Sequence, residues 1–288
     1  MVPTEPLYRI ADVDASDLSA YADGIDRLQN ETLDGFIIRN VLNREQLDKI
    51  IEAHDKLGPE TKYVSDTGMV FFPVPFSKVD QTVEGSAQEL EKYFLNYEEI
   101  WKNFPTQFGV DFEGIVQGVL TKIAGGRKVE TPIGINNVGK YSTAGLKHLI
   151  PDEGLFKAHC GNLFHKEFPT FYTHMNQIST VENQMSYFVM IEPSKAGGEL
   201  TLYDVLWTDA EIRMKGDVVL KGKNGELYDL EGPKKVRQQM LAPGPGDMIV
   251  FSGGRIWHRV EMVRHTRRLT CGGFVSLSKD DTKLYTWS

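Results

Sequence analysis

The sequence has little cysteine, a deficit of positive charge and no long hydrophobic run. Its 288 residues include two cysteines, Cys160 and Cys271, too few for a disulfide framework in so long a chain. Lysine and arginine number 32 against 40 acidic residues, and the net charge of −8 would repel a nucleic acid polymer. No apolar run approaches the roughly 20 residues that span a membrane, and no signal peptide is evident. We therefore expect a cytoplasmic protein with reduced thiols and with neither membrane contact nor a nucleic acid partner.

Composition and pattern indicate one globular unit with two unlike parts. Hydrophobic residues make up 41% of the chain, which is enough for a sizeable core. Helical periodicity dominates before residue 125, and short strands dominate after it. We expect a single domain over 1–288, with a mainly helical part and lid at 1–125 and a β core at 126–288. The pattern carries no signature of an oligomeric state.

Three helix starts are visible in the N-terminal part. Asn43 with Gln46, and Ser86 with Glu89, form two plausible capping boxes, each ahead of an amphipathic stretch. Asp111 is a third plausible cap, and a Gly-Gly pair would end the helix that follows it. These signals predict helices that pack outside the β core.

The C-terminal part is expected to be a sandwich or jelly roll, because its short apolar segments alternate with Gly, Pro, Asn and Asp. The segment 141–154 resembles a loop that leads into the strand of His159, and 63–86 resembles a second loop. The expected strands are 132–139, 155–161, 171–180, 185–191, 199–203, 226–230, 247–251, 256–263 and 268–278.

Two histidine segments carry the chemistry. In FKAHCGNLF (156–164), a strand would place His159 and Gly161 on one face and Cys160 on the other. Residues 244–274 contain a Gly-Gly turn followed by His258. Arg268 lies ten residues beyond His258, and Thr270 shares its strand face. A single strand histidine is usually structural, so only the combination points to a site.

This order of elements, with a GGEL strand between the two histidines, resembles the iron(II)/2-oxoglutarate-dependent oxygenase superfamily, especially its prolyl-hydroxylase-like branch, over roughly 130–280. The resemblance implies an α+β fold with a double-stranded β-helix (jelly roll, cupin-like) core and N-terminal helices packed outside. It implies Fe(II), 2-oxoglutarate and O₂ as cofactors. By position, His159 and His258 would bind the metal, while Arg268 and Thr270 would hold the distal carboxylate of 2-oxoglutarate.

The remaining site residues are aromatic. Tyr141 and Tyr187 are expected as further contacts to the cosubstrate. Phe76, Phe156 and Phe164 are expected to line an apolar substrate pocket near the metal.

The sequence departs from the superfamily pattern at Gly161, where the usual third ligand is a carboxylate. Three readings remain open: an open coordination position for a halide, an inactive site, or a carboxylate supplied from elsewhere. The His-x-Gly pattern resembles that of the iron/2-oxoglutarate halogenases. The length and the ending GGFVSLSKDD resemble the carrier-protein-independent members, which chlorinate free indole alkaloids of the hapalindole and welwitindolinone type.

This resemblance implies chloride as a further ligand and a free small molecule as substrate. The leading hypothesis is chlorination of an unactivated aliphatic carbon of an indole alkaloid-like molecule, by radical C–H abstraction and chlorine rebound. The alternatives are a hydroxylase, a halogenase acting on a free nucleotide or amino acid, and a catalytically silent jelly-roll binding protein.

Overall fold

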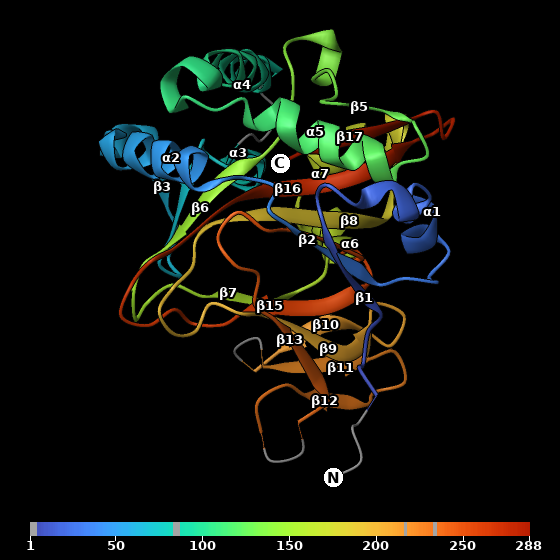
Figure 1. The fold of residues 1–288 in the computed structure, drawn as a ribbon. Helices are drawn as coiled ribbons and strands as arrows, with labels where there is room; N and C mark the ends of the chain where they lie inside the picture. Colours follow the sequence, from blue (N-terminus) through green and yellow to red (C-terminus); the bar gives the residue numbers. More distant parts are fainter. Residues whose placement is uncertain (1–4, 83–86, 216–217, 233–234) are drawn as a thin grey trace.

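Two β-sheets face each other at the centre of the molecule, and helices cover the outside of the larger one (Figure 1). The computed structural model describes residues 5–82, 87–215, 218–232 and 235–288. The facing sheets form the expected jelly roll, and the α+β class with helices outside the β core is confirmed.

The larger sheet combines strands from both parts of the chain. Its strands run in the order β1-β2-β14-β8-β16-β6-β4-β3, and β17 pairs with both β16 and β5. The N-terminal part therefore contributes strands as well as helices. The bounds are β1 Ile10–Asp14, β2 Gly35–Arg39, β3 Tyr63–Val64, β4 Met69–Phe72, β5 Lys128–Glu130, β6 Gly145–Leu149, β8 Ser179–Glu192, β14 Met248–Phe251, β16 Arg268–Ser278 and β17 Lys283–Trp287.

The smaller sheet carries both histidines of interest. Its order is β13-β9-β15-β7, with bounds Gln238–Leu241, Leu200–Leu206, Ile256–Val260 and Phe156–His159. A third sheet, with the order β10-β11-β12, lies beyond it (Figure 1). The third sheet's bounds are Ala210–Met214, Val219–Gly222 and Leu227–Asp229.

Alternation along β16 decides which side chains face the interior of the jelly roll. Leu269 and Cys271 belong to the apolar cluster under the helices. Arg268 and Thr270 therefore point to the opposite face, toward the smaller sheet. Between the sheets lies a second cluster, which includes Leu202 and Ile249.

The helices begin where the capping signals predict. Asn43 and Gln46 form a complete capping box at α2, and the side chain of Asp111 accepts a hydrogen bond from Gly114 N at α5. The other predicted box includes Ser86, which lies outside the described residues. The bounds are α1 Gly24–Gln29, α2 Arg44–Lys56, α3 Phe76–Thr82, α4 Ala87–Phe108, α5 Phe112–Ile123, α6 Gly161–Glu167 and α7 Pro169–Ile178; short 3₁₀ turns are η1 Leu18–Tyr21, η2 Pro59–Thr61 and η3 Ile135–Asn137.

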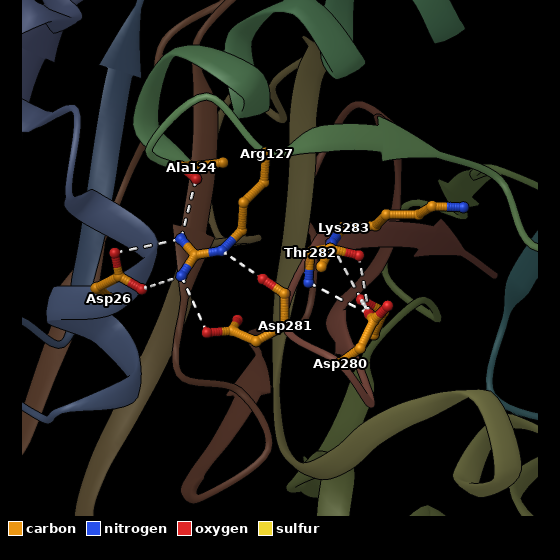
Figure 2. Close-up of polar contacts among 8 residues, drawn as sticks. Asp26, Ala124, Arg127, Asp280, Asp281, Thr282 and Lys283 are labelled. Atoms are coloured by element: carbon orange, nitrogen blue, oxygen red, sulfur yellow. Dashed lines mark hydrogen bonds and ion pairs between the residues drawn. The ribbon is translucent and has the colours of Figure 1, made fainter.

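Arg127 connects the helical layer to the strand that carries Arg268. Figure 2 shows its guanidinium between Asp26 of α1 and Asp281 of the β16–β17 turn. Its Nη2 atom lies 2.9 Å from one Asp26 oxygen and 3.2 Å from an Asp281 oxygen. In the same turn, the carboxylate of Asp280 accepts a hydrogen bond from Thr282 (Figure 2). It accepts a second hydrogen bond from Ser278. These bonds hold the far end of β16 in register.

Four segments differ from the sequence-based expectation. The predicted strand 171–180 lies mainly in α7. The predicted strand 132–139 instead contains the 3₁₀ turn η3, in which Asn136 and Asn137 have left-handed backbone angles. The predicted loop 141–154 contains β6, which pairs with β16 and β4. The predicted loop 63–86 contains β3, β4 and α3 in its described portion.

None of the helices in the described ranges combines the length and the apolar character that a membrane crossing requires.

Candidate functional site

The structure brings His159 and His258 together across neighbouring strands. The two residues are register partners in the β7–β15 pair, and their ring centroids lie 4.2 Å apart. Both side chains are buried. Two imidazoles from adjacent strands at this separation can bind one metal ion.

Backbone carbonyls orient both rings. His159 Nδ1 lies 2.7 Å from the Lys157 oxygen, and His258 Nδ1 lies 2.8 Å from the Ile256 oxygen. Since a carbonyl only accepts, each Nδ1 carries the proton and donates, and each Nε2 keeps a lone pair. Burial lowers the pKa of His258 to about 4 and places the pKa of His159 well below its usual range. Both imidazoles are therefore neutral at pH 7, the form that binds a metal, so the donor set fits iron.

Among the described residues, no acidic side chain completes this pair. In the described ranges, no group of three His, Cys, Asp or Glu residues could hold a metal ion. Gly161 is the first residue of α6, so the predicted strand 155–161 ends two residues early. Cys160 still points away from the histidines, into the cluster under the smaller sheet, as alternation predicted. The described residues therefore offer no carboxylate from elsewhere to replace the missing ligand.

Arg268 is a buried cation that forms no ion pair within the described residues, although the charge of the partly buried Glu199 attracts it. Its side chain lies over the Phe188 ring at 5.0 Å, and its Nε atom has no hydrogen-bond partner in the described part of the chain. Burial lowers its pKa to about 10, so it stays charged at pH 7. Gly198 of the GGEL segment gives it room, because a side chain there would approach Arg268 Cδ to 2.8 Å. Such an arginine is well suited to a ligand carboxylate.

Lys147 is a site residue that the sequence did not identify. It is the register partner of Thr270 on β6, and cross-strand partners point to the same face. It lines the cavity that also contains His159, and it forms no ion pair with any described residue. Burial lowers its pKa to about 8. The loop-like composition of 141–154 hides this strand residue. The alternation of apolar and polar side chains over Leu146, Lys147 and His148 is the signal that could have indicated a strand.

Tyr141 and Tyr187 do not reach this site. Tyr187 lies on the outer face of β8, in the cluster under the helices, and its hydroxyl donates to the Thr143 oxygen at 2.7 Å. Tyr141 packs in an aromatic cluster with Phe94, and its hydroxyl lies 2.9 Å from His174 Nδ1. Both phenols therefore form hydrogen bonds within the core, and neither residue lines the cavity that contains His159.

An apolar cavity of about 240 Å³ opens beside His159. Phe76, Phe156 and Phe164 all line it, as predicted. The Phe156 ring lies 4.1 Å and the Phe164 ring 5.4 Å from the His159 ring, between centroids. Four further aromatic side chains line it: Tyr63, Phe71, Phe168 and Phe274.

Comparison with known structures supports the fold. The N-substituted L-amino acid dioxygenase of Burkholderia ambifaria AMMD has a TM-score of 0.53 and 12% identity, covering 92% of this chain and 91% of that one. Its complex with alpha-ketoglutarate gives 0.52 and 11%, covering 91% and 90%. The alpha-ketoglutarate-dependent carbocyclase SnoK from nogalamycin biosynthesis gives 0.50 and 13%, covering 90% and 84%. At these identities the likeness concerns the fold alone.

Family comparison is more specific. No curated protein sequence matches the chain. The family model described as carrier-protein-independent halogenase WelO5 matches residues 7–288, nearly the whole length. The chain therefore belongs to the carrier-protein-independent halogenase WelO5 family and is a non-haem iron, 2-oxoglutarate-dependent enzyme.

Proposed function

We propose that this enzyme chlorinates an unactivated aliphatic carbon of a free small molecule. The observation that carries the proposal is a pair of neutral, buried imidazoles followed, two residues after His159, by a glycine in place of a carboxylate. A position without an anionic side chain beside a metal cation attracts an anion.

The chain's own residues have separate tasks in this proposal. His159 and His258 hold the iron through Nε2, and their backbone hydrogen bonds keep those atoms available. Arg268, Thr270 and Lys147 hold the distal carboxylate of 2-oxoglutarate on the inner face of the larger sheet. When bound, iron, 2-oxoglutarate, O₂ and chloride supply an oxidant that removes a hydrogen atom and a chlorine that replaces it, with release of succinate and CO₂.

The aromatic cavity beside His159 binds the substrate and excludes water. Phe76, Phe156 and Phe164 provide flat apolar surfaces, which suit an indole alkaloid-like molecule. A free nucleotide or amino acid is the second candidate class of substrate, since Lys78 and Lys157 also line the cavity.

Spectroscopy of the anaerobic complex tests the proposal. Protein with Fe(II) and 2-oxoglutarate under argon should give a weak visible charge-transfer band, and added chloride should shift it. His258→Ala should give no band, because it lacks a ligand for the iron. A wild-type band that chloride leaves unchanged would favour a hydroxylase. Absence of any band, and of succinate with every substrate offered, would favour a silent binding protein.

Lys147→Met tests the cosubstrate site. Loss of one charge-assisted hydrogen bond, worth about 1.5–3 kcal/mol, should weaken 2-oxoglutarate binding roughly 10- to 150-fold. Titration of the charge-transfer band with 2-oxoglutarate measures the dissociation constant. Lys157→Met is the matched control, since Lys157 is exposed at the cavity edge and should leave that constant unchanged. If both variants change the dissociation constant of 2-oxoglutarate equally, Lys147 does not contact the cosubstrate.

A further inference from the structure

Gln184 fills the space beside Gly161. It lies on β8 at the interior of the jelly roll, and none of its surface is exposed. A β-carbon added at Gly161 would lie 3.0 Å from Gln184 Nε2 and 3.1 Å from the Gly254 Cα atom. The carboxamide therefore stands where a carboxylate at residue 161 would begin.

A bulge in β8 brings Gln184 to this place. The pairing of β8 with β16 shifts between Thr180 and Met185, so the intervening residues leave the regular ladder. Asn183 within the bulge has a left-handed φ of 57°. Its backbone N–H donates to Asn162 Oδ1 and its Oδ1 accepts from Asn162 Nδ2, each at 2.9 Å. This amide pair fixes the bulge to the start of α6.

The turn before His258 joins the same cluster. The Gly161 N–H donates to the backbone carbonyl of Gly253 at 2.7 Å, and the Gly254 N–H donates to the backbone carbonyl of Gln184 at 2.7 Å. These bonds join the backbones of β8, the start of α6 and the turn before β15 around Gly161.

The carboxamide uses only part of its hydrogen-bonding capacity. In the described part of the chain, Nε2 donates to Tyr172 Oη at 2.7 Å, and Oε1 has no partner. An amide nitrogen carries two hydrogens, so one N–H next to Gly161 has no acceptor. A fully buried polar group without a hydrogen-bond partner lowers the stability of the fold unless a ligand accepts or donates that bond.

We propose that Gln184 donates a hydrogen bond to the halide ion in the position that Gly161 leaves open, and so sets the enzyme's affinity for halide. The inference rests on the proposed function. A neutral N–H donor favours an anion, whereas the carboxylate that is usual at position 161 would repel one. The residue is thus a specificity-determining contact that the spacing of the metal-binding motif does not reveal.

A halide titration tests the inference without turnover. Halide-free protein with Fe(II) and 2-oxoglutarate under argon is titrated with sodium chloride at constant ionic strength, with sulfate as the balancing salt. Gln184→Met keeps an unbranched side chain but has no N–H, and it should weaken chloride binding about 10- to 150-fold. The intensity of the band before chloride is added should stay the same, since no ligand of iron or 2-oxoglutarate is changed.

Tyr172→Phe is the matched control, because it removes the other partner of the carboxamide and leaves the N–H in place. It should change the chloride constant little. Equal losses in Tyr172→Phe and Gln184→Met would assign Gln184 a packing role and overturn the inference. An unchanged chloride constant in Gln184→Met would overturn it too, while leaving the proposed function intact. Absence of a chloride response in the wild-type protein would instead reject the proposed function itself.

Discussion

Gly161→Asp is expected to eliminate the chloride response of the anaerobic band and, with it, chlorination. The new carboxylate would take the open position beside His159 and His258 and repel the halide. Chloride titration of the variant, followed by product analysis with isotopic chloride, measures both effects. A variant that still binds chloride like the wild type would show that the open-position argument is wrong.

The structure adds that this single change will not make a good hydroxylase. The β-carbon at position 161 would lie 3.0 Å from Gln184 Nε2 and 3.1 Å from Gly254 Cα, and the latter is backbone that cannot swing away. Overpacking of this kind costs about 1–3 kcal/mol of unfolding free energy. Gly161→Asp/Gln184→Ala should recover part of that stability and yield more hydroxylated product than the single variant.

Gly161→Ala is the control for crowding. It adds the same β-carbon without a ligand, so it should lose stability yet keep the chloride response. Urea unfolding of the wild type, Gly161→Ala, Gln184→Ala and the double variant gives the coupling free energy between the two positions. A coupling free energy near zero would mean that Gln184 does not obstruct a side chain at position 161.

Arg268→Leu should weaken 2-oxoglutarate binding by about 2–5 kcal/mol, or roughly 30- to 5,000-fold, because it removes the buried cation that pairs with the distal carboxylate. The same variant should unfold at a higher temperature than the wild type when no cosubstrate is present. The reason is that the wild-type guanidinium is buried without a partner for its Nε atom in the described residues, which is unfavourable until a carboxylate arrives.

Arg267→Gln provides the neighbouring control. Arg267 points to the opposite side of β16 and contacts Asp55 of α2 and Glu192 of β8. Its loss should cost about 1 kcal/mol of stability, the scale of a partly exposed ion pair, and should leave 2-oxoglutarate binding unchanged. By calorimetry, Arg268→Leu should be more stable than the wild type and Arg267→Gln less stable. By titration, only Arg268→Leu should bind 2-oxoglutarate more weakly. If Arg267→Gln weakens cosubstrate binding as much as Arg268→Leu does, Arg268 is not the specific contact.

Some features of the site were readable in the sequence because they depend on short-range spacing. The period of two in a strand placed Arg268 and Thr270 on one face, and β16 has the predicted bounds 268–278. The capping boxes are equally local, since the side chain and backbone that they join lie three residues apart. The glycine at position 161 could be read directly.

Two other segments differ from the prediction because their local residue preferences indicate one structure, whereas contacts with distant parts of the chain stabilise another. Aromatic and β-branched residues in 171–180 favoured a strand, yet Pro169 begins a helix and Phe171, Tyr172 and Met175 form its buried face. In 141–154, Gly145 and the polar residues obscured a strand that is held on both sides by β16 and β4. In 141–154, pairing with distant strands overrode the local signals, whereas in 171–180 the burial of one helix face did so.

By itself, the sequence determined the class of fold, the two histidines, the Arg268–Thr270 pair and the missing carboxylate. Only the tertiary structure decided which groups stand around them. Lys147 reaches the inner face of the larger sheet because β6 pairs with β16 beside Thr270. Gln184 reaches Gly161 because a bulge in β8 is fixed to α6 by two asparagines from distant segments. Contacts of this kind follow from strand register and bulges, and no spacing along a single chain segment encodes them.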